Sequence, residues 1–282
     1  MLFIMENTTW YSLILWKMKK IIILLVLVLT TSASYAWHNN CHEGIVILAV
    51  EHLNPEAKSA VEKYLGQSYN DDIKYLYKLE KAGKAKHGEE IHYLHLAKNF
   101  KPKAKKNNPN DAYNAINKQL EVIKAHSQHP KQKVTEALRT LIDLMCDIHD
   151  LAHYRIKGYP HSYEAFTYLV PRSDSGKGAK KMSKTKWATT WSHFGNYPAG
   201  FSGAFRAYDM KLCLDGRFAE FTKGGLVDWI VDNGTIAASY LDKCMPDSVV
   251  PYMEHKKIED VNYDMMIKAS CRLAKLLNET LK

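Results

Sequence analysis

Apolar residues recur every three or four positions along five stretches of the chain, and this spacing is typical of one face of an α-helix. The stretches are residues 42–66, 111–126, 133–154, 224–244 and 258–281. The first is interrupted at Asn54–Pro55 and closed by Gly66, a residue that commonly ends helices. No run of alternating residues competes with these helices, and the chain has no internal repeat. We therefore predict an all-α fold with many helices in a single domain.

Three connectors separate the predicted helices. Residues 98–111 and 171–186 are rich in lysine, contain Gly, Pro or Asn, and have no periodicity. Such loops usually form solvated surface, an interpretation that we favour over contact with phosphate groups. Residues 187–205 are aromatic and rich in glycine, which fits either a loop packed over a cleft or ordinary core packing.

The N-terminal region has the pattern of a secretory signal. From Met18, two lysines precede an apolar run at residues 21–29, and the small residues Ser34 and Ala36 follow. The apolar run is shorter than the roughly 20 residues of a membrane-spanning helix. We therefore expect residues 1–36 to be a signal peptide region whose true start is Met18.

Export has consequences for the rest of the chain, residues 37–282. We expect a periplasmic or secreted protein with a single domain over this range. The formal net charge is +9 for the full chain and +7 for residues 37–282, which suits a polyanionic substrate, although a positive balance more often serves solubility. All five cysteines lie in the exported part, and an odd number leaves at least one thiol unpaired or intermolecular. They form no CxxC pair, which argues against a cysteine-based zinc site.

One apolar stretch, residues 141–154, contains five groups that resist burial. These are Asp143, Asp147, His149, Asp150 and His153. Either the segment is a solvent-exposed face, or the side chains share cations that make their burial tolerable. On one continuous helix the two aspartates four apart and the two histidines four apart point about 80 to 160 degrees away from each other. One ion cannot easily collect all four, whereas several ions can collect Asp143, Asp147 and His153 with one bridging carboxylate.

The predicted mature N-terminus adds to this pattern. Signal cleavage leaves Trp37 as the first residue, followed by His42 five positions later. Together with residues 141–154, this arrangement resembles the S1/P1 nuclease family and its relative, the zinc-dependent bacterial phospholipase C. In that family a first Trp binds zinc through its amino group and carbonyl oxygen, assisted by a nearby His. The resemblance implies a multi-helix phospholipase C/P1 nuclease-like fold over residues 37–282, with Trp37 and His42 as zinc ligands.

The resemblance continues along the chain. The family's Trp-Ala-Asp stretch, followed three residues later by Arg, looks like "YNDDIK". This match implies Asp71 as a ligand and Lys74 in place of the Arg. The family's His-Tyr stretch looks like "IHYLHL", which implies His92 as a further ligand.

The signature helix of the family, His-x-x-Gly-Asp-Ile-His-Gln-Pro-Leu-His, looks like "DLMCDIHDLAH". The match implies that Asp147 is the bridging carboxylate and that His153 is a ligand. Asp143 stands where the family has a histidine, and it offers an oxygen donor that zinc accepts. The last pattern, Leu-His-x-x-Trp-Asp, is matched by "AFRAYD", in which Asp209 fits and Phe205 occupies the histidine position.

The resemblance therefore implies a centre of up to three zinc ions. Its implied ligands are Trp37, His42, Asp71, His92, Asp143, Asp147, His153 and Asp209. Phe205 leaves the third ion with two protein ligands, fewer than tight zinc binding needs, unless His161 or His193 reaches in. Because Cys41 adjoins His42 and Cys146 adjoins Asp147, a shared ion would make the two sulfur atoms neighbours. We predict a Cys41–Cys146 disulfide on that basis.

The function implied by the resemblance is that of an exported zinc-dependent phosphodiesterase. It would hydrolyse single-stranded nucleic acid or 3′-nucleotides through a zinc-bound hydroxide. Asp71 would orient or deprotonate the attacking water, and Lys74 would neutralise phosphate charge. Tyr and Trp residues at 187–201 would stack bases, or else form core. We expect nucleic acid or nucleotides as partners, with no stable membrane insertion and no protein partner.

Two other functions stay open. A degenerate family member would bind phosphate compounds or a partner without turnover, and Lys74, Asp143 and Phe205 are the departures that this hypothesis predicts. A phospholipase C-like lipase would need an apolar rim near the metals for membrane contact, and the Lys-rich connectors argue mildly against it.

Overall fold

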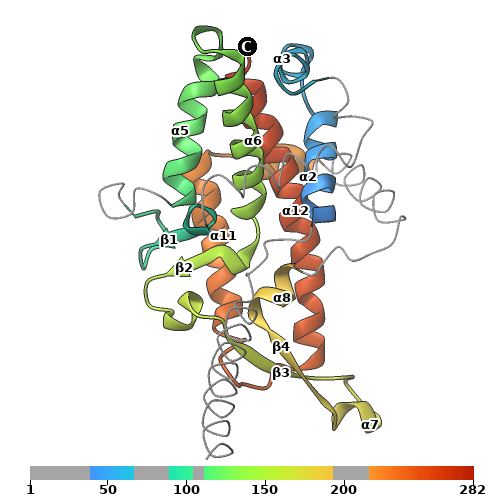
Figure 1. The fold of residues 1–282 in the computed structure, drawn as a ribbon. Helices are drawn as coiled ribbons and strands as arrows, with labels where there is room; N and C mark the ends of the chain where they lie inside the picture. The colour runs from blue at the N-terminus through green and yellow to red at the C-terminus, as the bar shows by residue number, and fades with distance from the viewer. Residues whose placement is uncertain (1–38, 67–88, 104–110, 193–215) are drawn as a thin grey trace, which may run out of the picture. The chain divides into compact units, whose positions relative to one another are not determined.

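One compact unit, Ala36–Lys282, contains every residue that the computed structural model describes (Figure 1). The described ranges are residues 39–66, 89–103, 111–192 and 216–282. The unit has its own hydrophobic core, as an independently folding domain does. The predicted signal peptide region lies outside the described residues. Across the described ranges, every helix is too short or too polar to span a membrane.

Most of the described chain is helical, as the periodicity predicts. The longer helices are α2 (Asn39–Glu51), α3 (Pro55–Leu65), α5 (Ala112–Lys124), α6 (Lys131–Asp147), α11 (Leu226–Leu241) and α12 (Tyr252–Thr280). The shorter α-helices are α7 (Gly176–Ala179), α8 (Trp187–Ser192) and α10 (Arg217–Phe221). The structure also has four short 3₁₀ helices in the described ranges, which are η2 (Glu89–His92), η3 (His126–Gln128), η4 (Leu151–His153) and η5 (Pro160–Tyr163). Each of the five periodic stretches contains one or two of the longer helices, because its apolar stripe can bury one helical face.

The break between α2 and α3 lies where the sequence predicts it. The side-chain oxygen of Asn54 accepts a hydrogen bond from the Ala57 amide (2.8 Å), and Pro55 occupies the first helical position. Gly66 follows the last residue of α3 with φ 98°, in the region that favours glycine. Both ends of α3 are therefore set by local residue chemistry.

The cap of α3 gives a first prediction. We expect Asn54→Ala to lower the free energy of unfolding by about 1 kcal/mol, because the Ala57 amide loses its acceptor. Urea unfolding followed by circular dichroism measures this change. Asn54→Asp keeps a capping oxygen and is the matched control, which should stay within a few tenths of a kcal/mol of the parent. Equal losses in both variants would contradict the capping role.

Helices α2, α5, α6 and α12 pack around a common core. Figure 1 shows α5 and α6 side by side, with the long α12 running past α2 and α6. Fully buried apolar side chains from α2, α6 and α12 fill the space between them. Examples are Ile45, Leu48, Leu138, Leu141, Met266 and Leu273. This core surrounds the end of α6 that carries the candidate site.

The structure also has two small sheets that the all-α prediction lacks. Strand β1 (Leu94–Leu96) pairs in parallel with β2 (Tyr154–Ile156), and β3 (Thr167–Pro171) pairs antiparallel with β4 (Met182–Lys186). Residues 171–186, predicted as a solvated loop, are largely exposed but contain the strand β4 and the short helix α7. Burial alternates along β3, but its sequence TYLVP shows no alternation of apolar and polar residues. Strand β4 has no buried residue, and it forms because β3 offers it hydrogen-bond partners.

The aromatic connector that begins at residue 187 is a helix in its first part. Helix α8 buries Trp187 and Trp191, whose rings pack against Phe166 at 5.5 Å and Tyr240 at 5.4 Å respectively. Of the two alternatives for this segment, base stacking or core packing, the structure shows core packing for these two tryptophans. Residues 193–205 of the connector lie outside the described residues.

The predicted Cys41–Cys146 disulfide is not present. Both side chains are buried thiols, and no bond joins their sulfur atoms. Consecutive residues of a helix point about 100° apart, so two residues that face each other do not bring their chain neighbours together. Cys244 and Cys271 are also buried thiols, and Cys213 lies outside the described residues.

Candidate metal centre

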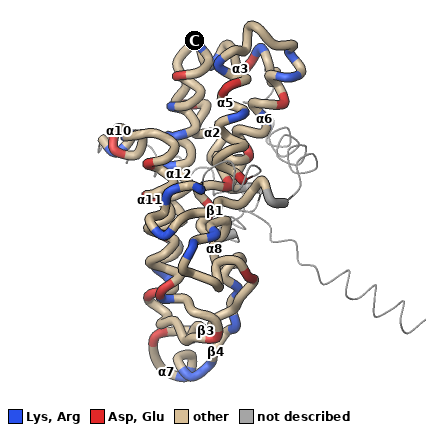
Figure 2. Tube along the Cα trace, turned by 90° about the vertical axis from the view of Figure 1, so that its left-hand side faces the viewer, with Lys and Arg blue, Asp and Glu red and all other residues tan. Residues whose placement is uncertain are grey.

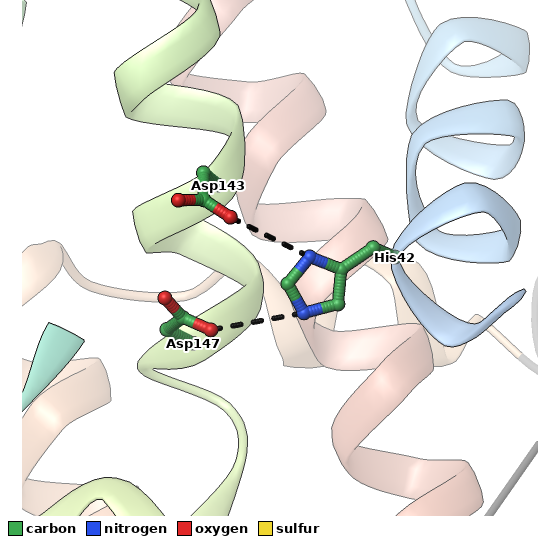
Figure 3. A group of neighbouring side chains, drawn as sticks. All are labelled: His42, Asp143 and Asp147. Carbon is green, nitrogen blue, oxygen red and sulfur yellow. Dashed lines mark ion pairs between the residues drawn. The ribbon is translucent and has the colours of Figure 1, made fainter. Parts of the chain in front are cut away.

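Two carboxylates from α6 form the base of the candidate site. Asp143 and Asp147 are four residues apart, so they lie on one face of the helix, close to its C-terminal end. That face is turned towards α2, which brings His42 opposite them (Figure 3). All three side chains are buried, with exposed fractions of 4% for His42, 3% for Asp143 and 0% for Asp147.

The imidazole of His42 lies between the two carboxylates. Its Nδ1 is 3.7 Å from Asp143 Oδ1, and its Nε2 is 3.7 Å from Asp147 Oδ1 (Figure 3). One ligand atom from each of the three residues lies within 4.8 Å of the other two. This buried group can therefore hold a metal ion.

A second imidazole approaches the same carboxylates. His92, the last residue of η2, has its Nδ1 3.8 Å from Asp143 Oδ2 and in hydrogen-bond contact with Asp147 Oδ2. The Oδ1 atoms of both aspartates thus face His42, and their Oδ2 atoms face His92. Asp147 lies between two histidines, which is the position that a bridging carboxylate requires.

The histidines around Asp147 stabilise the negative charge of its carboxylate. Burial alone raises the pKa of Asp147, but the hydrogen bond from His92 and the nearby positive charges of His153, His92 and His42 outweigh it. The pKa of Asp147 is consequently well below its ordinary value, and the carboxylate is ionised. A buried anion is tolerated only when cations or hydrogen-bond donors surround it, and this site provides such surroundings.

The predicted ligand His153 lies next to this group, in the segment that follows α6, and its charge acts on Asp147. Among the described residues, the compact set of three ligands consists of His42, Asp143 and Asp147. His153 lies in η4, with its Nδ1 3.6 Å from Asp150 Oδ2 and its ring 5.3 Å from that of Tyr93. Asp150 also accepts a hydrogen bond from the Ala152 amide (2.9 Å). His153 contributes to the charge around Asp147 from this separate position.

The reason for this arrangement is that α6 ends at Asp147. The periodic stretch predicts a helix as far as residue 154, but the chain instead leaves the helix and turns through residues 148–150. The side chains on either side of this point therefore do not share one helical axis. His161, named as a substitute ligand, has its Nε2 3.3 Å from the Leu241 carbonyl oxygen, and it lies against Phe166.

His149 is buried for a different reason. It lies between the carbonyl oxygen of Met145, which accepts from Nδ1 (2.7 Å), and the guanidinium of Arg272, which donates to Nε2 (3.1 Å). Burial, and then the positive charge of Arg272, hold the pKa of His149 well below its ordinary value. His149 is thus a neutral residue of the core whose two nitrogens are both hydrogen-bonded.

Arg272 is a key residue that the sequence analysis missed. Its buried guanidinium donates to four acceptors from three other parts of the chain. These are the Phe221 carbonyl oxygen (3.0 Å), Asn233 Oδ1 (3.0 Å), His149 Nε2 (3.1 Å) and Asp232 Oδ2 (2.9 Å). Asn233 in turn donates to the Ile148 carbonyl oxygen (2.9 Å), directly after the end of α6. The sequence signal that could have identified Arg272 is its position within the apolar periodic stretch at residues 258–281, where a charged side chain must have buried partners.

Several residues of the predicted site lie outside the described residues. They are the predicted site residues Trp37, Asp71, Lys74 and Asp209, the alternative ligand His193, and Phe205, which occupies a histidine position of the family. Of the predicted ligands that are described, the structure brings together His42, His92, Asp143 and Asp147.

The donor chemistry of this group fits a transition-metal ion such as zinc. Zinc accepts imidazole nitrogen and carboxylate oxygen, and donors at about 2.0–2.1 Å from a tetrahedral ion are roughly 3.3 Å apart. One ligand atom from each of His42, Asp143 and Asp147 lies within 4.8 Å of the other two, so small side-chain movements would bring them to that spacing around one ion. Asp147 Oδ1 is buried and accepts no hydrogen bond from the described residues, which leaves it available as a ligand.

No protein-family model matches the chain, and no curated protein matches it at a significant level.

Proposed function

We propose that the chain is an exported zinc-dependent phosphodiesterase of the S1/P1 nuclease type. It would hydrolyse single-stranded nucleic acid or 3′-nucleotides. The observation that carries this proposal is the position of Asp143 and Asp147 between His42 and His92, with one oxygen of each carboxylate towards each imidazole. Two carboxylates shared in this way by two histidines suit neighbouring cations, which is the arrangement used for phosphate ester hydrolysis.

Each described residue has a defined task in this proposal. When bound, zinc supplies a Lewis acid that polarises a phosphoryl oxygen and makes water more acidic. Asp147 would be a ligand of the metal, and its low pKa keeps it ionised for that task. Asp143 would supply a second anionic donor to the metal. The burial of all these side chains limits access of bulk water, which strengthens their electrostatic attraction for cations.

The remaining parts of the proposal rest on the resemblance. Trp37, Asp71 and His153 would complete the zinc ligands, with Asp209 at the third ion. Asp71 would orient the attacking water, and Lys74 would neutralise charge on the phosphate. Export to the periplasm or the medium would give the enzyme access to extracellular nucleic acid.

The experiment that tests the proposal is elemental analysis of protein whose N-terminus has been confirmed as Trp37. We expect about two or three zinc ions per chain after zinc reconstitution, and hydrolysis of single-stranded DNA, RNA or 3′-nucleotides that stops on chelation. Absence of bound metal would overturn the proposal in favour of a non-catalytic family member. Bound zinc with hydrolysis of phospholipid alone would identify a lipase.

A further inference from the structure

The β3–β4 hairpin has one face in the core and one face in solvent. Tyr168 and Val170 of β3 are buried. The alternate residues of β3 lie on the opposite face, where the register pairs Leu169 with Lys184 and Pro171 with Met182. The β4 residues on that face are exposed, and 44% of the Met182 surface is accessible. Aliphatic and cationic side chains therefore share the solvent face of the hairpin.

A third segment extends this face. The Leu169 amide donates to the Ser248 carbonyl oxygen and the Val250 amide donates to the Leu169 carbonyl oxygen, both at 2.8 Å. Leu169 and Val249 are bridge partners, so their side chains lie on the same side of the sheet. Val249 is 55% exposed, whereas its neighbour Val250 is buried on the core side. Val249, Leu169, Pro171 and Met182 thus form an aliphatic strip that we call the hairpin face.

Cations surround the hairpin face. The hairpin and its connecting loop carry six exposed basic residues, which are Arg172, Lys177, Lys180, Lys181, Lys184 and Lys186. None of the six forms an ion pair with any residue in the described ranges. Asp174 in the loop, Asp247 next to β3 and the exposed Glu164 three residues before β3 are acidic residues of the same region. Figure 2 marks the backbone positions of lysine and arginine around β4 and α7 in blue.

We propose that the hairpin face docks on the surface of an anionic phospholipid membrane. Lysines around exposed aliphatic side chains match such a surface, because the headgroups attract the cations while the aliphatic groups enter the interfacial region. A single-stranded nucleic acid would call for aromatic side chains that stack bases, and residues 171–186 contain none. This docking is peripheral, and it is independent of the proposed metal chemistry.

The test is co-sedimentation with vesicles of phosphatidylglycerol and phosphatidylcholine. The protein is the chain that begins at Trp37, which contains all the described elements of the compact unit. We expect binding to anionic vesicles that falls steeply with added salt and is absent from pure phosphatidylcholine. The Lys180→Gln/Lys181→Gln/Lys184→Gln variant should bind on the order of 100-fold more weakly, since each basic side chain near the surface contributes about 1 kcal/mol.

The matched control removes three exposed lysines from α5 and α6 instead. Lys118→Gln/Lys124→Gln/Lys131→Gln has the same net charge as the hairpin variant and should bind at least tenfold more tightly than that variant. Equal losses in the two variants would overturn the proposal, because attraction would then depend on net charge alone. Failure of the parent to bind anionic vesicles at low salt would also overturn it. Hairpin-dependent binding of a single-stranded oligonucleotide without vesicle binding would assign this face to nucleic acid instead.

Discussion

We expect Arg272→Ala to lower the free energy of unfolding by about 3–5 kcal/mol, the range seen when one partner of a buried charged network is removed. The substitution leaves the Phe221 carbonyl oxygen, Asn233 Oδ1 and His149 Nε2 without the donor that now satisfies them. Each buried acceptor without a donor adds a desolvation cost. Guanidinium chloride unfolding measures the loss, and a strongly reduced melting temperature should accompany it.

A control substitution on the same helix distinguishes the loss of the Arg272 network from the loss of a positive charge elsewhere in α12. Lys275 makes an exposed ion pair with Glu279, and its replacement by alanine should change stability by less than about 0.5 kcal/mol. Asn233→Ala provides a milder test where Arg272→Ala fails to fold, because it removes one partner of Arg272 and the donor to Ile148. Arg272→Ala and Lys275→Ala variants of equal stability would show that the network does not contribute.

The second large effect concerns Asp147. We expect Asp147→Asn to weaken zinc binding by at least two orders of magnitude, because the amide removes the anionic oxygens that face His42 and His92. Asn has nearly the same size and shape as Asp, so the packing at the end of α6 should persist. Calorimetric titration with zinc measures the affinity, and circular dichroism confirms that the helices are intact.

Asp232→Asn is the matched control for this substitution. Asp232 is also an aspartate with cationic partners, but it pairs with Lys268 and Arg272 away from His42 and His92. We expect this variant to bind zinc as the parent does. Equal weakening in both variants would show that zinc responds to net charge and not to the buried carboxylates, and undiminished binding in Asp147→Asn would place the ion elsewhere.

The predicted ligands illustrate how far sequence reasoning reaches. The spacing of Asp143 and Asp147 places them on one helical face whatever the rest of the fold does, since the period of the helix sets their directions. The resemblance to the S1/P1 nuclease family then nominated His42 and His92, which the structure brings to these carboxylates from α2 and η2. The same argument nominated His153, which lies in η4 past the end of α6 at Asp147, an end that the periodic pattern did not predict.

Local residue chemistry determined the helices of this protein and several of their ends. The apolar period predicted α2, α3, α5, α6, α11 and α12, and Asn54 and Gly66 marked the ends of α3, because caps and turns depend on residues a few positions apart. The tertiary structure alone decided which polar groups meet. His149 accepts a hydrogen bond from Arg272, which is 123 residues away in the chain. Strand β4 forms because β3 provides its hydrogen-bond partners. Such pairings depend on how helices and strands pack, and packing is not encoded in any local pattern of the chain.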